Sequence, residues 1–167
     1  MMLRPFLMMC CTFVGAILLF QLGACSSAKN TPDPLVDVPE NFRVVFGQGG
    51  GFAGLWEGFT VQPDGSVLEW QGRYQEDGAK PSGQLDAEQI GLLWQCVEEH
   101  DFFTQEQDDR GNMTGHIRIF ANADTHQVFW RPTPALAQLP LAPLDSLFLR
   151  MHEIIASRTL DPEPTPE

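Results

Sequence analysis

Basic side chains are scarce in this chain of 167 residues. It has 10 lysines and arginines against 22 aspartates and glutamates, a formal net charge of -12, and its only lysines are Lys29 and Lys80. A net negative charge of this size repels the phosphate backbone of nucleic acids, and the sequence has no basic stripe to offset it, so nucleic-acid binding is not expected. A hydrophobic fraction of 43 %, with 12 phenylalanines and 4 tryptophans, excludes a chain that is disordered throughout. The length predicts about one domain.

A long apolar run occurs only near the amino terminus. Residues 6–22 follow Arg4 and are almost wholly apolar, a pattern typical of a secretory signal and short for a membrane span. The next residues, Leu22-Gly23-Ala24-Cys25, resemble the bacterial lipobox. The resemblance implies cleavage between Ala24 and Cys25, lipid on Cys25 and, with Ser26 following, transfer to the outer membrane facing the periplasm. An ordinary signal peptide or an uncleaved anchor helix is the alternative.

Cleavage divides the chain into four expected segments. Residues 1–24 are a signal peptide, and residues 25–40 are the lipidated cysteine and a proline-rich tether. Residues 41–158 form the folded domain, and residues 159–167 form a disordered acidic tail. Acyl chains on Cys25 would hold the domain at a membrane. Cys96 is then the only thiol left in the domain, so no internal disulfide is expected.

The periodicity within residues 41–158 predicts an α+β domain. Alternating apolar residues predict strands near residues 42–46, 55–61 and 66–71, the last two joined by the turn Pro63-Asp64-Gly65. Residues 72–83 look polar and mobile.

Two helices and a second hairpin complete the pattern. Asp86 and Gln89 resemble a capping box, and the spacing of apolar residues after them predicts a helix to about His100. Leu92 lies off its apolar face, which suggests that this helix is covered on two sides. A hairpin follows over residues 113–130, then a C-terminal helix with Leu144, Leu147, Phe148, Met151 and Ile155 on one face. The expectation is an antiparallel sheet of about five strands, in βββ-α-ββ-α order, with both helices packed on one face.

The run Gly49-Gly50-Gly51-Phe52-Ala53-Gly54 has the spacing of a dinucleotide-binding fingerprint. That mechanism needs a helix at the last glycine, whereas the next residues alternate like a strand, so nucleotide binding is not expected. Glycines here allow positive φ values. Phe52 either folds back onto the core, which is the commoner outcome, or projects as an anchor for a partner.

Residues that could carry chemistry do not form a recognisable pattern. The histidines, His100, His116, His126 and His152, lack the spacing of zinc ligands, and the apparent register of the second hairpin pairs residue 126 with residue 119 rather than with His116. No nucleophile elbow is present, and Cys96 lies at the flank of an apolar helix face, where small buried cysteines are common. We therefore expect no catalytic residues, no metal and no cofactor.

The order of the segments resembles the emfourin family, small bacterial proteins that inhibit thermolysin-like metalloproteases. The resemblance covers about residues 42–156. It rests on a strand, the Gly50-Gly51-Phe52-Ala53-Gly54 loop, a second strand, a helix ending at Asp101-Phe102-Phe103, and the final hairpin and helix. It implies a binding module without catalytic activity whose partner is a metalloprotease, and we take Gly50, Gly51, Phe52, Ala53 and Gly54 as its contact. The alternatives are an envelope-assembly lipoprotein that docks a protein, or a lipoprotein that binds a small molecule or carbohydrate.

Overall fold

A computed structural model describes residues 37–133 and 141–160. In chain order the elements are β1 (Arg43–Gly50), β2 (Leu55–Val61), β3 (Ser66–Gly72), β4 (Lys80–Gln84), α1 (Ala87–Glu99), the 3-10 turn η1 (Phe102–Thr104), β5 (Met113–Ala121), β6 (Asp124–Trp130) and α2 (Pro143–Ala156). Cys25 and the expected signal peptide lie outside the described residues.

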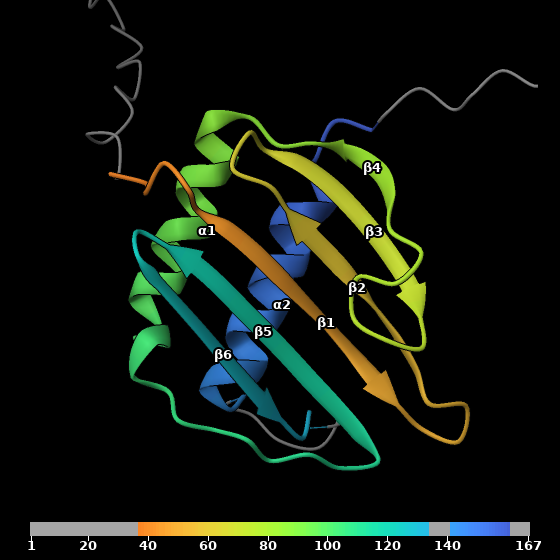
Figure 1. Ribbon diagram of the computed structural model, residues 1–167. Helices are drawn as coiled ribbons and strands as arrows, with labels where there is room; N and C mark the ends of the chain where they lie inside the picture. The colour runs from red at the N-terminus through yellow and green to blue at the C-terminus, as the bar shows by residue number, and fades with distance from the viewer. Residues whose placement is uncertain (1–36, 134–140, 161–167) are drawn as a thin grey trace, which may run out of the picture. The chain divides into compact units, whose positions relative to one another are not determined.

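The strands form one antiparallel sheet in the order β4-β3-β2-β1-β5-β6, and both helices lie behind it in Figure 1. The predicted α+β class is therefore confirmed, in the order ββββ-α-ββ-α. The register of the second hairpin is also confirmed, because Ile119 pairs with His126. The additional strand is β4, which the sequence analysis assigned to a mobile segment.

Alternation along the strands divides the sheet into two faces. Phe46, Ile117 and Val128 lie on adjacent strands and enter the core beneath the helices. The capping box at the start of α1 is confirmed, because the Asp86 carboxylate accepts from the backbone of Gln89 and the Gln89 side chain accepts in return. Leu92 is exposed, so the expectation that α1 is covered on two sides is wrong.

The face of the sheet away from the helices is shaped by glycines that leave room for tryptophans. Gly47 of β1 pairs with Gly58 of β2, and a Cβ atom at Gly58 would lie 2.6 Å from the Trp70 ring and nearer still to the carbonyl oxygen of Phe46. Trp70 is 1 % exposed and crosses this pair from β3. The same arrangement recurs where Trp56 lies over Gly49.

The β3–β4 connection is a cover for this outer face. Glu76 has a φ of 62° and pairs with Arg43, and its carboxylate also accepts from the buried hydroxyl of Thr60 at 3.0 Å. Beyond it, β4 is held by backbone pairing with β3 and by the bridge between Gln84 and Thr159. Backbone pairing needs no alternation of side chains, which is why the polar sequence of β4 gave no strand signal.

The folded domain extends slightly beyond its expected limits. Val38, expected in the tether, packs against the core. Thr159, expected to begin the tail, exchanges two backbone hydrogen bonds with Gln84, at 2.8 and 3.0 Å. Both limits depend on tertiary contacts that local composition does not show.

Candidate binding site

The β1–β2 connection forms a narrow tip at one end of the sheet (Figure 1). Gly50, Gly51 and Gly54 have φ values of 115°, 65° and 62°, which a residue with a Cβ atom rarely adopts. The Gly54 amide donates to the Gly51 carbonyl at 3.3 Å and closes a turn with Phe52 and Ala53 at its corner. This turn directs Phe52 into solvent, where its relative exposure is 111 %.

Two further apolar side chains stand beside Phe52. Leu55 of β2 and Met113 of β5 both pair with Gly50, one from each side, and their exposures are 45 % and 43 %. The sulfur of Met113 lies close to Gly51. Phe52, Leu55 and Met113 are thus three exposed apolar side chains at the same end of the sheet, which we call the tip.

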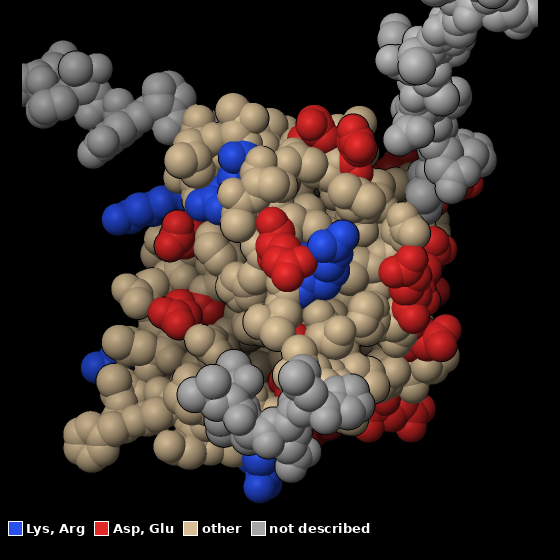
Figure 2. Space-filling model, turned by 180° about the vertical axis from the view of Figure 1, so that it is seen from behind, with Lys and Arg blue, Asp and Glu red and all other residues tan. Residues whose placement is uncertain are grey.

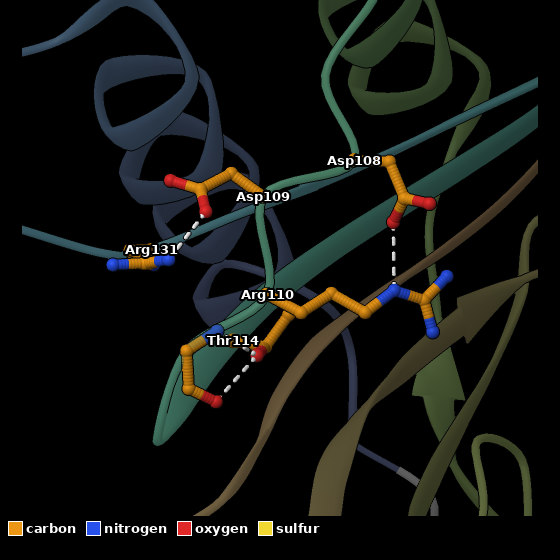
Figure 3. A network of polar contacts seen from close by, with 6 residues as sticks. Asp108, Asp109, Arg110, Thr114 and Arg131 are labelled. Atoms are coloured by element: carbon orange, nitrogen blue, oxygen red, sulfur yellow. Dashed lines mark hydrogen bonds and ion pairs between the residues drawn. The ribbon is translucent and has the colours of Figure 1, made fainter.

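The segment before β5 supports the base of the tip. The Gly51 amide donates to the carbonyl of Asn112, and a Cβ atom at Gly50 would collide with that carbonyl oxygen. The Thr114 hydroxyl donates to the carbonyl of Gly111 at 3.2 Å and accepts from its amide at 3.1 Å, which closes the turn containing Asn112 (Figure 3). A supported base lets the tip meet a partner with little ordering cost.

This geometry decides between the alternatives left by the sequence. The interpretation that Phe52 folds back onto the core is wrong, because its side chain is fully exposed. The chain enters β2 directly after Gly54, so the glycine run is not followed by the helix N-terminus that a dinucleotide site requires.

The four histidines lie apart and serve different local contacts. His100 ends α1 and contacts the Cys96 carbonyl at 2.8 Å, while His126 contacts the Gln105 carbonyl at 2.8 Å. Among the described residues no group of three or more His, Cys, Asp and Glu side chains could hold a metal ion. Cys96 is buried as predicted, and burial raises the pKa of its thiol to about 11.

His116 is a feature that the sequence analysis missed. It is fully buried on the outer face, between Trp56 and Phe129, and neither ring nitrogen has a hydrogen-bond partner. The pKa of His116 is lowered to about 3, chiefly by burial and to a smaller extent by the charges of Arg118 and Arg110. Its imidazole is therefore neutral in the folded protein at ordinary pH.

The segment that covers the outer face beside His116 is attached to β6 by backbone hydrogen bonds of Gln107 and Asp109 with Phe129, and it carries two exposed ion pairs. Asp108 pairs with Arg110 at 2.7 Å, and Asp109 pairs with Arg131 at 2.9 Å (Figure 3). The Arg110 guanidinium lies 3.7 Å from the centre of the Phe129 ring. The cover explains why His116, on a strand with a glycine neighbour, is sealed from solvent.

A groove on the helix side of the sheet was also missed. It has a volume of about 390 Å³, and it lies where the edge of α2 leaves β2 and β3 uncovered. Its lining comes from three strands and α2: Gln48, Glu57, Gly58, Phe59, Glu69, Trp70, Gln71, Phe148 and His152. Only the crossing of α2 over the sheet brings its aromatic residues to these carboxylates, so local sequence patterns gave no signal.

No protein-family model matches the chain, and no curated protein sequence matches it significantly. Within residues 37–133 and 141–160, no helix is both long and apolar enough to cross a membrane. A function for this domain must therefore be argued from its tip and its groove.

Proposed function

We propose that this chain is a lipid-anchored binding module of the cell envelope, without catalytic activity, that inhibits a thermolysin-like metalloprotease through its tip. The observation that carries the proposal is Phe52, a large aromatic side chain fully exposed on a supported turn. Loop tips on rigid scaffolds are common binding devices, and aromatic side chains are enriched among the residues that dominate binding energy.

The surface of the tip favours a protein partner. Phe52, Leu55 and Met113 are apolar and lie at the same end of the sheet, which suits insertion into an apolar pocket. The resemblance of the segment order to emfourins points to a thermolysin-like metalloprotease as that partner. The anchor on Cys25 would hold the module on the periplasmic side of the outer membrane, where an envelope protease is encountered.

Each edge strand of the sheet is bridged by another segment at one position, which disfavours the assembly alternative by strand addition. At β6, Phe129 exchanges backbone hydrogen bonds of 2.9 Å with Gln107 and Asp109. At β4, Pro81 lacks an amide hydrogen and Gln84 is paired with Thr159. The tip remains the more open binding surface among the described residues.

Inhibition of a purified thermolysin-like protease by the detergent-solubilised chain tests the proposal. Burying a fully exposed phenylalanine contributes about 1.5–3 kcal/mol, so Phe52→Ala should weaken inhibition about 10- to 150-fold. Leu160→Ala is the matched control, because Leu160 is also exposed, at 67 %, but lies beside the Gln84–Thr159 bridge, away from the tip. No inhibition by the unaltered chain, or equal effects of the two variants, would refute the proposal.

A further inference from the structure

The groove beside α2 is lined by both acidic and aromatic side chains. Its floor carries Glu57 and Glu69 on neighbouring strands, with Phe59 between them, because Phe59 pairs directly with Glu69. Its wall carries Phe148 and His152, one turn apart on α2 and 4.6 Å apart between ring centres. Acidic and aromatic groups thus face the same space.

Neither carboxylate forms an ion pair among the described residues, although Lys80 of β4 is the cross-strand neighbour of Glu69. Glu57 accepts from the Gln48 amide at 3.2 Å, and Glu69 accepts from the Ser82 hydroxyl at 3.3 Å. Both are exposed, so their oxygens retain free acceptor positions. Figure 2, which views the helix side, shows more acidic than basic side chains over this face.

The aromatic groups provide flat surfaces, and the residues that line the groove include no lysine or arginine. His152 contacts the rings of Phe46 and Phe59, with ring centres 5.1 and 5.7 Å away. Burial lowers the pKa of His152, an effect that the nearby charge of Glu57 partly opposes, so the imidazole is neutral at neutral pH. The chain already places one guanidinium here, since Arg158 lies 5.4 Å from the centre of the Phe59 ring.

From these contacts we infer that the groove binds the guanidinium group of an arginine side chain on a protein partner. A guanidinium is planar, stacks on aromatic faces and donates hydrogen bonds to carboxylates in a fixed fork. A lysine ammonium could meet the carboxylates, but it lacks the flat surface that matches Phe59, Phe148 and His152. Anionic groups would be repelled by Glu57 and Glu69.

The groove and the tip are continuous along the sheet. Gln48 pairs with Glu57, and Gly50 pairs with Leu55 two residues further along both strands and on the same face. Two residues span about 7 Å of strand. A partner whose apolar pocket encloses Phe52 could therefore place an arginine near that pocket into the groove. The identity of that partner rests on the proposed function, whereas the binding of a guanidinium does not.

The test titrates the labelled full chain, in detergent micelles, with N-acetyl-arginine amide and follows its NMR chemical shifts. Saturable shifts are expected at Glu57, Phe59 and His152, and N-acetyl-citrulline amide, the neutral isostere, should produce none. N-acetyl-lysine amide should bind at least about threefold more weakly. The double variant Glu57→Gln/Glu69→Gln should weaken arginine binding at least about tenfold.

The control removes the same charge elsewhere. Glu88→Gln/Glu98→Gln changes two exposed carboxylates of α1 and should alter arginine binding less than about twofold. No saturable shift, equal binding of citrulline or lysine analogues, or equal losses in the two double variants would overturn the inference. None of these outcomes depends on Phe52, so failure here leaves the inhibition assay to decide the proposed function separately.

Discussion

His116 makes the stability of this domain depend on pH in a way that one substitution can remove. The side chain is fully buried, and its folded-state pKa of about 3 lies far below the ordinary value of 6.5. Burial is the main cause, followed by Arg118 and Arg110. The folded protein thus holds His116 neutral at a pH where the unfolded chain binds a proton.

The sign and size of the effect follow from linkage. Because the folded pKa of His116 is lowered, its contribution is fully present above pH 6.5 and is lost as the pH falls towards about 3. Each pH unit within this window costs about 1.4 kcal/mol. Between about pH 7.5 and about pH 4.5 the folded state should lose about 3 kcal/mol through this residue alone.

Urea unfolding of purified protein, followed by tryptophan fluorescence at both pH values, measures this loss. His116→Leu removes the titrating ring and its two unpartnered nitrogens. Between the two pH values, the free energy of unfolding of this variant should therefore fall by about 3 kcal/mol less than that of the unaltered protein. His116→Gln is polar but does not titrate and should show the same reduced pH dependence. Equal pH dependence in all three proteins would refute the assignment of a neutral, buried His116.

Two further predictions concern the outer face of the sheet. Gly58→Ala should lower the free energy of unfolding, measured by thermal denaturation, by about 3 kcal/mol or more, because the added Cβ atom would overlap Trp70. Gly91→Ala in α1 is the comparison: the added Cβ atom meets open space and should raise the free energy of unfolding by about 0.5–1 kcal/mol. Glu76→Ala should cost about 1–3 kcal/mol in urea unfolding, because the buried Thr60 hydroxyl loses its partner, and Glu76→Gln should recover at least half. Equal stabilities within either pair would contradict these contacts.

Much of the fold was predictable from local patterns. Alternating apolar residues predicted β1, β2, β3 and the final hairpin, and a capping box with helical periodicity predicted α1. These signals are local, because they depend on the direction of successive side chains and on the hydrogen bonds that cap the end of a helix. The strand β4 escaped because its partners, β3 and Thr159, are defined only by the folded chain.

The candidate site was only partly predictable. The glycine run was a candidate because glycines permit unusual turns, but the direction of Phe52 depends on how Gly51 and Gly54 orient that turn. The groove depends on where α2 crosses the sheet, which no local pattern records. The burial of His116 depends on the segment that pairs with Phe129 of β6 and could not be deduced from its place in a strand.

Hydroxyl-radical footprinting by mass spectrometry tests the central claim, that the tip is the surface through which this module holds a metalloprotease. The side chains of Phe52 and Met113 are exposed in the free chain and should be oxidised readily. With saturating thermolysin-like protease, oxidation of both should fall at least about fivefold, while Leu160, which is 67 % exposed beside the Gln84–Thr159 bridge, should be unaffected. Unchanged oxidation of Phe52 in the presence of protease would contradict the account.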